Sequence, residues 1–368
     1  MSNSSPIKVL VVDDSAAIRA AYGAIIDDDP GLALMAMAPD PFVAVEKMRK
    51  ELPDVILLDL ELPRMDGLTF LKRIMGQRPL PVVVCSSYTE AGSQAMMTAL
   101  QSGAKEVLAK PRFDTPMARR EAAIRLGDAL RAAVVAHGGK SGKTAVPLSP
   151  GEKLTADAIL PPLAPRPVPP TVPIVAIGAS TGGTEALQTV LTALKPDAPA
   201  IAIVQHMPEK FTEAFARRLN GICDIEVREA RDGDTMESGL ALLAPGNHHM
   251  AVRRVGHIYR VEILDGPYVS RHRPSVDVLF RSVAQSAGAN ALAAILTGMG
   301  DDGARGMAEL HRAGARTLAQ DEATSVVYGM PREAVAHGGV DRVLPIGSFH
   351  AEIMAWGKTK DLIAGKTA

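Results

Sequence analysis

The chain has 368 residues, 47% of them hydrophobic, and its 40 Lys and Arg against 41 Asp and Glu give a formal net charge of -1. This length predicts at least two domains, and the near-zero charge argues against a general nucleic-acid or membrane-surface binder. The sequence lacks a signal-like start and any apolar run near the ~18 residues of a membrane span, and its two cysteines suit a reducing compartment. We therefore expect a cytoplasmic protein that is not itself a membrane protein.

The first third of the chain alternates between two kinds of pattern. Short β-branched runs at 7–12, 55–58 and 82–85 are separated by helix-like segments such as 41–51 and 90–101. This alternation is typical of a parallel sheet wrapped by helices.

Charged residues follow the strands of this predicted sheet. Asp13 and Asp14 come directly after the first strand, Asp59 follows the third, and Lys110 follows the fifth. Ligands bind at the rim where parallel strands end, so these side chains should converge there. Carboxylates this close need a compensating cation, which favours Mg²⁺ with oxygen ligands. A second interpretation, in which Asp13 and Asp14 cap the next helix, stays open.

With Ser86 after the fourth strand, segment 7–120 resembles the receiver domain of two-component response regulators. The resemblance implies that a histidine kinase donates a phosphoryl group to Asp59 and that Ser86 and Lys110 contact that group. It also implies a set of Mg²⁺ ligands, namely Asp13, Asp14, Asp59 and the carbonyl of Glu61. Val107 stands where the family usually carries an aromatic switch residue.

A change of composition separates this domain from the rest. Residues 112–135 are charged and alanine-rich, as in a helix, whereas 138–170 is rich in Gly, Pro, Ser and Lys. Dense prolines cannot join a sheet and stiffen the chain, which indicates a linker. We divide the chain into a receiver domain at 6–123, a linker at 124–171 and a catalytic domain at 172–362.

The α/β rhythm returns after the linker, with strand-like runs at 174–178, 200–205, 241–244 and 291–297. The predicted fold class is therefore α/β, with two doubly wound parallel-sheet domains joined by a Pro-rich linker. The first is expected to be flavodoxin-like and the second a Rossmann-like three-layer domain.

The glycine-rich break in "VPIVAIGASTGGTEAL" allows two interpretations: it cradles a phosphate, or it presents Ser180 as a nucleophile. A dinucleotide site would want an acidic residue ending the next strand, but that strand ends in His206. Asp302 follows a later buried strand, so a serine, a base and an orienting carboxylate can meet at one rim. Their chain order differs from that of the α/β-hydrolases, so the elbow match does not indicate that family.

Residues 173–355 resemble the catalytic domain of the bacterial protein-glutamate methylesterases, through stretches such as "AIGASTGGTEAL", "IVQHMP" and "ILTGMGDDGA". The resemblance implies that Ser180 is the nucleophile, His206 the base and Asp302 the orienting acid. It also places Thr181 and the amide of Met299 in the site, with no cofactor in this domain. We assign Asp301 no role.

The two resemblances together imply a function in chemotactic adaptation. The enzyme would hydrolyse glutamyl γ-methyl esters on methyl-accepting chemotaxis proteins, and deamidate their glutamines, under control of phosphorylation at Asp59. We expect a monomer. Two alternatives remain: a phospho-regulated Ser-His-Asp hydrolase with another substrate, and a response regulator whose output domain binds nucleotide or DNA.

Two further clusters of histidine and arginine stand in the second domain. His248 and His249 lack a third ligand at zinc spacing, which favours roles in a loop or pocket wall. Arg271, His272 and Arg273 form either a solvated loop or, as the resemblance implies, part of the active-site entrance.

Overall fold

The computed structural model describes residues 5–86, 90–111, 115–138, 153–162 and 168–364. The chain divides into two compact units, Met1–Gly151 and Glu152–Ala368. Each unit has its own core of buried apolar residues. Each core is self-contained, as expected of two domains.

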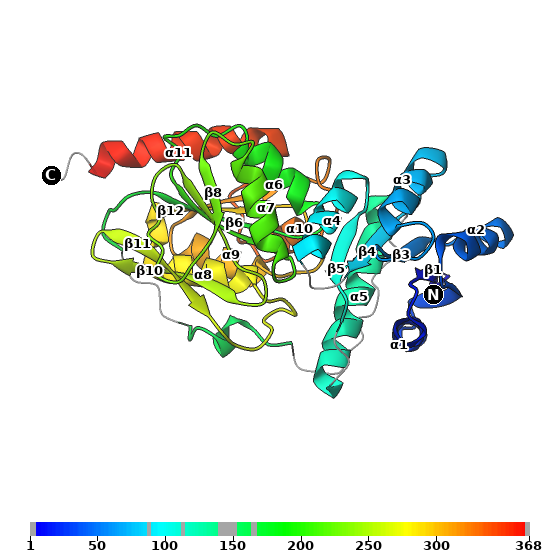
Figure 1. Ribbon diagram of the computed structural model, residues 1–368. Coiled ribbons are helices and arrows are strands. Elements are labelled where there is room, and N and C mark those ends of the chain that lie inside the picture. The colour runs from blue at the N-terminus through cyan, green and yellow to red at the C-terminus, as the bar shows by residue number, and fades with distance from the viewer. Residues whose placement is uncertain (1–4, 87–89, 112–114, 139–152, 163–167, 365–368) are drawn as a thin grey trace. The chain divides into compact units, whose positions relative to one another are not determined.

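The first unit is a five-stranded parallel sheet with strand order β2-β1-β3-β4-β5, the flavodoxin-like order. Its helices cover both faces, with α1 against α5 and α3 against α4 (Figure 1). The strands are β1 (Ile7–Val12), β2 (Leu32–Ala38), β3 (Val55–Asp59), β4 (Val82–Ser86) and β5 (Glu106–Ala109). The helices are α1 (Ala16–Asp27), α2 (Pro41–Lys50), α3 (Gly67–Gln77), α4 (Glu90–Gln101) and α5 (Pro116–Ala136).

The second unit is built on a seven-stranded sheet with order β14-β13-β12-β6-β7-β9-β8, in which every pairing is parallel. Its strands are β6 (Ile174–Ala179), β7 (Ala200–Gln205), β8 (Glu226–Glu229), β9 (Leu240–Leu243), β12 (Ala291–Ile295), β13 (Arg316–Gln320) and β14 (Arg342–Leu344). The predicted class of two doubly wound α/β domains is confirmed.

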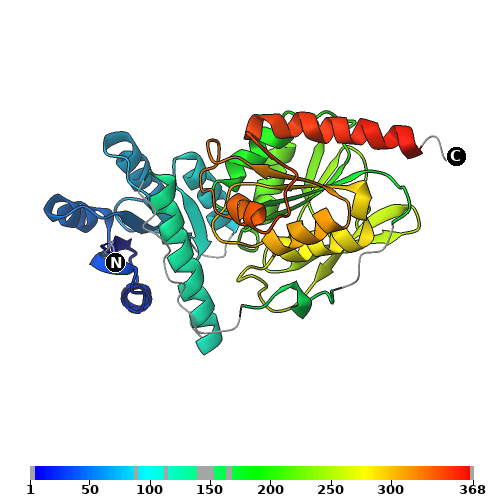
Figure 2. The ribbon, with the colours of Figure 1, turned by 180° about the vertical axis from the view of Figure 1, so that it is seen from behind.

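Helices cover both faces of this second sheet. On one face α8 (Val276–Ser286), α9 (Ala304–Arg312) and α10 (Met330–Ala336) pack side by side. On the other, α6 (Gly183–Leu191) packs against α11 (Phe349–Ala364), with α7 (Phe211–Asn220) beside it (Figures 1 and 2). The strands β6, β7, β9 and β12 are thus buried on both faces, which explains their largely apolar sequences.

An antiparallel hairpin, β10 (His249–Val255) and β11 (Ile258–Leu264), lies outside the large sheet and packs on α8. This hairpin was not predicted from the sequence. Apolar and charged residues alternate in β11 from Tyr259 to Ile263, after a turn at Gly256 and His257. That alternation is the signal of a half-buried hairpin.

Parts of the expected linker at 124–171 belong to the two compact units. Helix α5 continues from Pro116 to Ala136, across the expected domain boundary at 123. Residues 153–162 belong to the second compact unit, and residues 139–152 and 163–167 lie outside the described part of the chain. Within the described helices, none is both long and apolar enough to cross a membrane.

Candidate active site and acidic pocket

Asp13, Asp14 and Asp59 meet at the rim of the first sheet. Strand β1 lies between β2 and β3, so the order of the strands reverses at β1. This is the topological switch point where such folds bind ligands. Each of the three carboxylates offers an oxygen within 4.8 Å of the others. Helix α1 is capped by Ser15, whose side chain accepts from the Ile18 amide. Asp13 Oδ1 accepts from the Ser15 amide (2.9 Å) just before the helix, and its Oδ2 lies beside Lys110 in the pocket.

Lys110 completes the pocket, with Nζ 2.7 Å from Asp59 Oδ2 and 3.0 Å from Asp13 Oδ2. Burial raises the pKa of Asp59 to about 6, despite the opposing effect of the Lys110 ammonium. Burial also lowers the pKa of Lys110, but the hydrogen bond and charge of Asp59, with those of Asp13, outweigh it and leave that pKa above its ordinary value. The lysine is therefore a cation at neutral pH.

The pocket contains the carboxylate oxygens that a hard divalent ion requires as ligands. Asp13 Oδ2 is buried, and Lys110 Nζ lies 3.0 Å from it. Ser86 Oγ is also buried and has no hydrogen-bond partner in the described part of the chain. At Gly67 a Cβ would lie 2.1 Å from the carbonyl oxygen of Asp59, so only glycine lets α3 begin this close to the aspartate. The residues present thus fit Mg²⁺.

Ser180 lies at the corresponding rim of the second sheet, at the end of β6. Its amide donates to the Thr297 carbonyl (3.0 Å) after β12, and the His206 amide after β7 donates to Ala179 (3.2 Å). Strands β12 and β7 flank β6 on opposite sides, so this rim is again a topological switch point. A Cβ at Gly298 would lie 2.7 Å from the Ser180 Cβ, which explains why a glycine occupies the facing turn.

His206 is joined to Asp302 by a hydrogen bond of 2.8 Å from Nε2 to Oδ2. The other ring nitrogen, Nδ1, is buried and has no hydrogen-bond partner among the described residues. Because the carboxylate accepts from Nε2–H, the neutral ring presents an unprotonated Nδ1. The structure thus leaves a basic nitrogen beside the rim that carries Ser180.

Asp302 is fully buried and accepts three further hydrogen bonds, from Ser275 Oγ (2.8 Å) and from the amides of Val276 (2.8 Å) and Asp277 (3.0 Å). The last two amides belong to the first turn of α8, where anions are stabilised. Burial raises the pKa of Asp302, but the hydrogen bond and charge of His206 outweigh it and hold that pKa at about 2. The carboxylate is therefore ionised throughout the neutral range.

His272 lies face to face with His206, with ring centroids 3.6 Å apart and an interplanar angle of 6°. Its Nδ1–H donates to the Ser270 carbonyl (2.9 Å). Burial, and then the neighbouring His206, lower the pKa of His272 to about 3, so this ring is neutral at physiological pH. Of the two interpretations of the 271–273 segment, the half-buried His272 stacked on His206 favours a place beside the site, a position that sequence reasoning could not assign.

His248 and His249 are engaged by protein groups. His248 Nδ1 lies 2.7 Å from an Asp265 oxygen. His249 donates from Nε2 to the Pro267 carbonyl (2.9 Å) and accepts at Nδ1 from the Ser275 amide (3.2 Å). His249 thus supports the loop that holds Asp302, in keeping with the structural role expected for it.

Asp277 predicts a pH dependence of stability. Burial, and then the charge of Asp302, raise the pKa of Asp277 to about 7. Its raised pKa means that the folded state retains this proton where the unfolded state has lost it, so stability falls as the pH rises from about 4 through 7. Asp277→Asn should therefore reduce the loss of unfolding free energy between about pH 5 and pH 8.

Fluorescence of Trp356, the one tryptophan of the sequence, reports unfolding of the second unit. Asp224→Asn is the matched control, because Asp224 is exposed and paired with the exposed Lys195. An equal pH-dependent loss in wild type and Asp277→Asn would contradict the buried-proton account.

The two rims define a class of protein: a response regulator whose output domain carries a serine and a hydrogen-bonded histidine–aspartate pair after neighbouring strands of one sheet. Residues 9–119 match the response regulator receiver domain family, and residues 175–353 match the CheB methylesterase family. The chain is 60% identical over 351 residues to the protein-glutamate methylesterase/protein-glutamine glutaminase of group 3 operon of Cereibacter sphaeroides, covering 95% of each chain.

A second relative is the protein-glutamate methylesterase/protein-glutamine glutaminase 5 of Anaeromyxobacter dehalogenans, 55% identical over 354 residues, or 96% of this chain and 97% of the relative. The crystal structure of the Thermotoga maritima CheB methylesterase catalytic domain is 33% identical, covering 50% of this chain and 98% of that chain with a TM-score of 0.49. The chain belongs to the family of protein-glutamate methylesterases/protein-glutamine glutaminases.

Proposed function

We propose that this chain hydrolyses glutamyl γ-methyl esters on methyl-accepting chemotaxis proteins and deamidates glutamines there, under control of phosphorylation at Asp59. The observation that carries the proposal is the His206–Asp302 hydrogen bond of 2.8 Å, which leaves Nδ1 of His206 without a partner among the described residues. The names of relatives that align over 95% or more of this chain support the substrate class.

In the proposed reaction the unprotonated Nδ1 of His206 accepts the proton of Ser180 Oγ as that oxygen bonds to the ester carbonyl carbon. The imidazolium formed is stabilised by the ionised Asp302. His206 then returns the proton to the leaving methoxy oxygen, and methanol departs from an acyl-serine. A water molecule, deprotonated by His206, cleaves the acyl-serine and releases glutamate and Ser180.

The negative oxygen of the tetrahedral intermediates needs hydrogen-bond donors. We assign this role to Thr181 and the amide of Met299, which flank Ser180 and the Gly298 turn at the same rim. Loss of one such donor typically costs ~3–4 kcal/mol of transition-state stabilisation. A glutamine amide enters the same cycle, with ammonia leaving in place of methanol.

In the receiver domain, Asp59 is the proposed phosphoryl acceptor. The carboxylates of Asp13, Asp14 and Asp59, with the carbonyl of Glu61, would hold Mg²⁺, which when bound neutralises charge on the phosphoryl oxygens. Ser86 Oγ and Lys110 Nζ would contact the same oxygens. The phosphoryl group adds nearly two negative charges, which bias the domain toward a second conformation that raises esterase activity.

The proposal includes the setting of the reaction: a monomeric cytoplasmic enzyme that receives its phosphoryl group from a chemotaxis histidine kinase. A nucleotide-binding output domain is disfavoured because the strand after β6 ends in His206, which is engaged with Asp302 rather than free to bind a ribose. A hydrolase with another substrate differs only in what it cleaves. Methanol release from methylated receptor membranes, with and without a phosphodonor, separates these functions.

Removal of Mg²⁺ should act on the receiver domain alone. We expect a chelator to abolish stimulation of methanol release by a small-molecule phosphodonor while leaving the unstimulated rate unchanged, because every oxygen of Asp302 is already engaged by protein donors. Asp14→Ala removes one proposed Mg²⁺ ligand, so it should also lower the stimulation by phosphodonor and leave the unstimulated rate unchanged. A fall in the unstimulated rate on chelation would show that the catalytic domain needs a metal.

A further inference from the structure

Residues 153–161, hereafter the strap, run along the second unit before its first strand. They include the short 3-10 helix η1 (Ala156–Ala158). The strap contacts three separate parts of the second unit: the turn at Asp301, the loop that carries His272, and α8. Each of these parts adjoins His206 or Asp302. None of these contacts was expected from the sequence, where the segment reads as linker.

The first contact is an ion pair between Lys153 and Asp301. Asp301 directly precedes Asp302 in the turn after β12, so the position of its carboxylate and that of the Asp302 backbone are linked through one peptide unit. Both charged side chains are partly exposed, with 29% and 44% of their surface accessible. The strap thereby holds the outer side of the turn that carries Asp302.

The second contact fixes the loop that carries His272. The Ser270 amide donates to the Leu154 carbonyl (2.9 Å), and the Ser270 carbonyl accepts from His272 Nδ1 (2.9 Å). Ala156 packs against Val269 in a small buried cluster beside this loop. Two consecutive hydrogen bonds therefore connect the strap to the ring stacked on His206.

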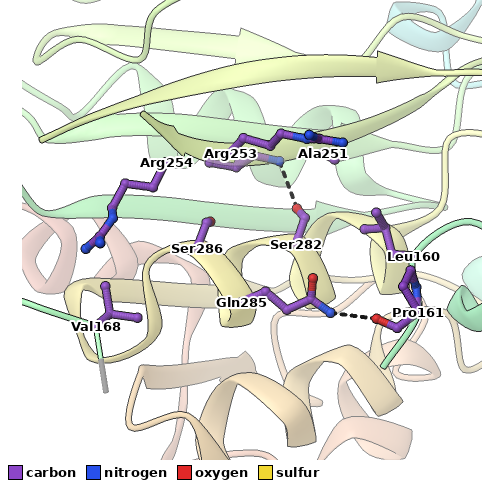
Figure 3. Close-up of a pocket in the computed structure, with 10 residues that line it drawn as sticks. Leu160, Pro161, Val168, Ala251, Arg253, Arg254, Ser282, Gln285 and Ser286 are labelled. Carbon is purple, nitrogen blue, oxygen red and sulfur yellow. Dashed lines mark hydrogen bonds between the residues drawn. The ribbon is translucent and has the colours of Figure 1, made fainter. Parts of the chain in front are cut away.

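The third contact is to α8, whose first amides hold Asp302. The buried Arg281 of α8 binds Asp157 and donates to the Leu160 carbonyl (2.9 Å), while Glu309 accepts from its Nε (2.9 Å) and Nη2 (2.6 Å). Gln285, one turn further, donates to the Pro161 carbonyl (2.9 Å). Figure 3 shows Leu160, Pro161 and Gln285 together at one end of a surface pocket of about 510 Å³ between α8 and β10.

We propose that the strap is a positioning segment of the esterase site, which keeps the His206 ring aligned between Asp302 and His272. The proposal rests on the roles assigned above to Ser180, His206 and Asp302. Three groups that touch the base or its carboxylate depend on the strap: the Asp301 turn, the His272 loop and α8. Small displacements of a catalytic group lower the chemical rate strongly, whereas they need not alter substrate binding.

The test uses the full-length protein and methylated receptor membranes. Lys153→Met removes the ion pair to Asp301 at a partly exposed position. Asp157→Asn weakens the third contact, the ion pair between Asp157 and Arg281 of α8. We expect each to lower kcat for methanol release, with about a tenfold loss in the double variant, and to leave KM unchanged, with and without a phosphodonor. Lys153→Arg, which retains the cation, should restore the rate.

Lys195→Met is the matched control, because Lys195 forms an exposed ion pair with Asp224 on the same unit. Trp356 fluorescence during heating verifies that each variant is folded. A double variant with unchanged kcat, or with its change confined to KM, would overturn the positioning role. If Ser180→Ala retained full activity in the same assay, the proposed function itself would fail, which is a separate result.

Discussion

Ser180→Ala in the full-length chain should lower the rate of methanol release from methylated receptors by a factor on the order of 10⁴ to 10⁶. The nucleophilic oxygen is lost, and what remains is catalysis from the hydrogen-bond donors and from substrate binding. His206→Ala should cost nearly as much, and the double variant little more, because the members of a triad act as a unit. The same variants should lose glutamine deamidation in parallel, since both reactions use one acyl-serine.

Asp302→Asn tests the orientation of the base. An asparagine can donate to Nε2, which would leave Nε2 unprotonated and place the proton on Nδ1, the nitrogen proposed to act on Ser180. A loss on the order of 10⁴ is expected for such a wrong tautomer. Trp356 fluorescence controls for folding. Near-normal methanol release from Ser180→Ala would remove the assigned nucleophile, and equal activity of Asp302→Asn would remove the tautomer argument.

Asp59→Asn should abolish the response to a small-molecule phosphodonor and Mg²⁺ while keeping the unstimulated esterase rate. The amide lacks the nucleophilic carboxylate oxygen that bonds to phosphorus, but Lys110 can still donate to its carbonyl oxygen, so the pocket should stay folded. The measurement is the ratio of methanol release with and without phosphodonor, together with phosphate incorporated per chain.

Asp27→Asn is a suitable control, because Asp27 is an exposed carboxylate at the end of α1 in the same unit. It should retain the full stimulation. Stimulation that survives in Asp59→Asn would place the phosphoryl group elsewhere. Loss of the unstimulated rate in that variant would show that the receiver domain supports catalysis even before phosphorylation.

Much of the fold and of both rims could be predicted because the information is local. Runs such as 55–58 and 174–178 are apolar throughout, as is typical of strands covered on both faces. Once the strands are parallel, residues directly after them share one rim, and that rule brought Asp13 to Asp59 and His206 to Asp302. Strand β2 was missed because its Leu, Ala and Met residues favour a helix over a strand. The β10–β11 hairpin was missed because charged residues interrupt its apolar positions, which is a weaker signal.

The remaining parts of the site depend on tertiary contacts. No sequence pattern indicates that His272 stacks on His206, since the two rings come from loops after different strands. Likewise, no sequence pattern indicates that Asp302 contacts Nε2 of His206 rather than Nδ1, because this depends on the orientation of the ring in the fold. Lys153 was predicted to lie in the linker because its ion-pair partner, Asp301, is 148 residues away in the sequence.

The strap also bears on how such a chain can be assembled from interchangeable modules. A recombination joint placed among residues 139–152 would leave both α5 and the strap whole, so that a foreign receiver could be joined to an intact esterase. A joint at 171, the end of the expected linker, would separate the esterase from the nine residues of the strap, 153–161. The compact unit that contains the esterase site begins at Glu152, well before the first strand of its sheet.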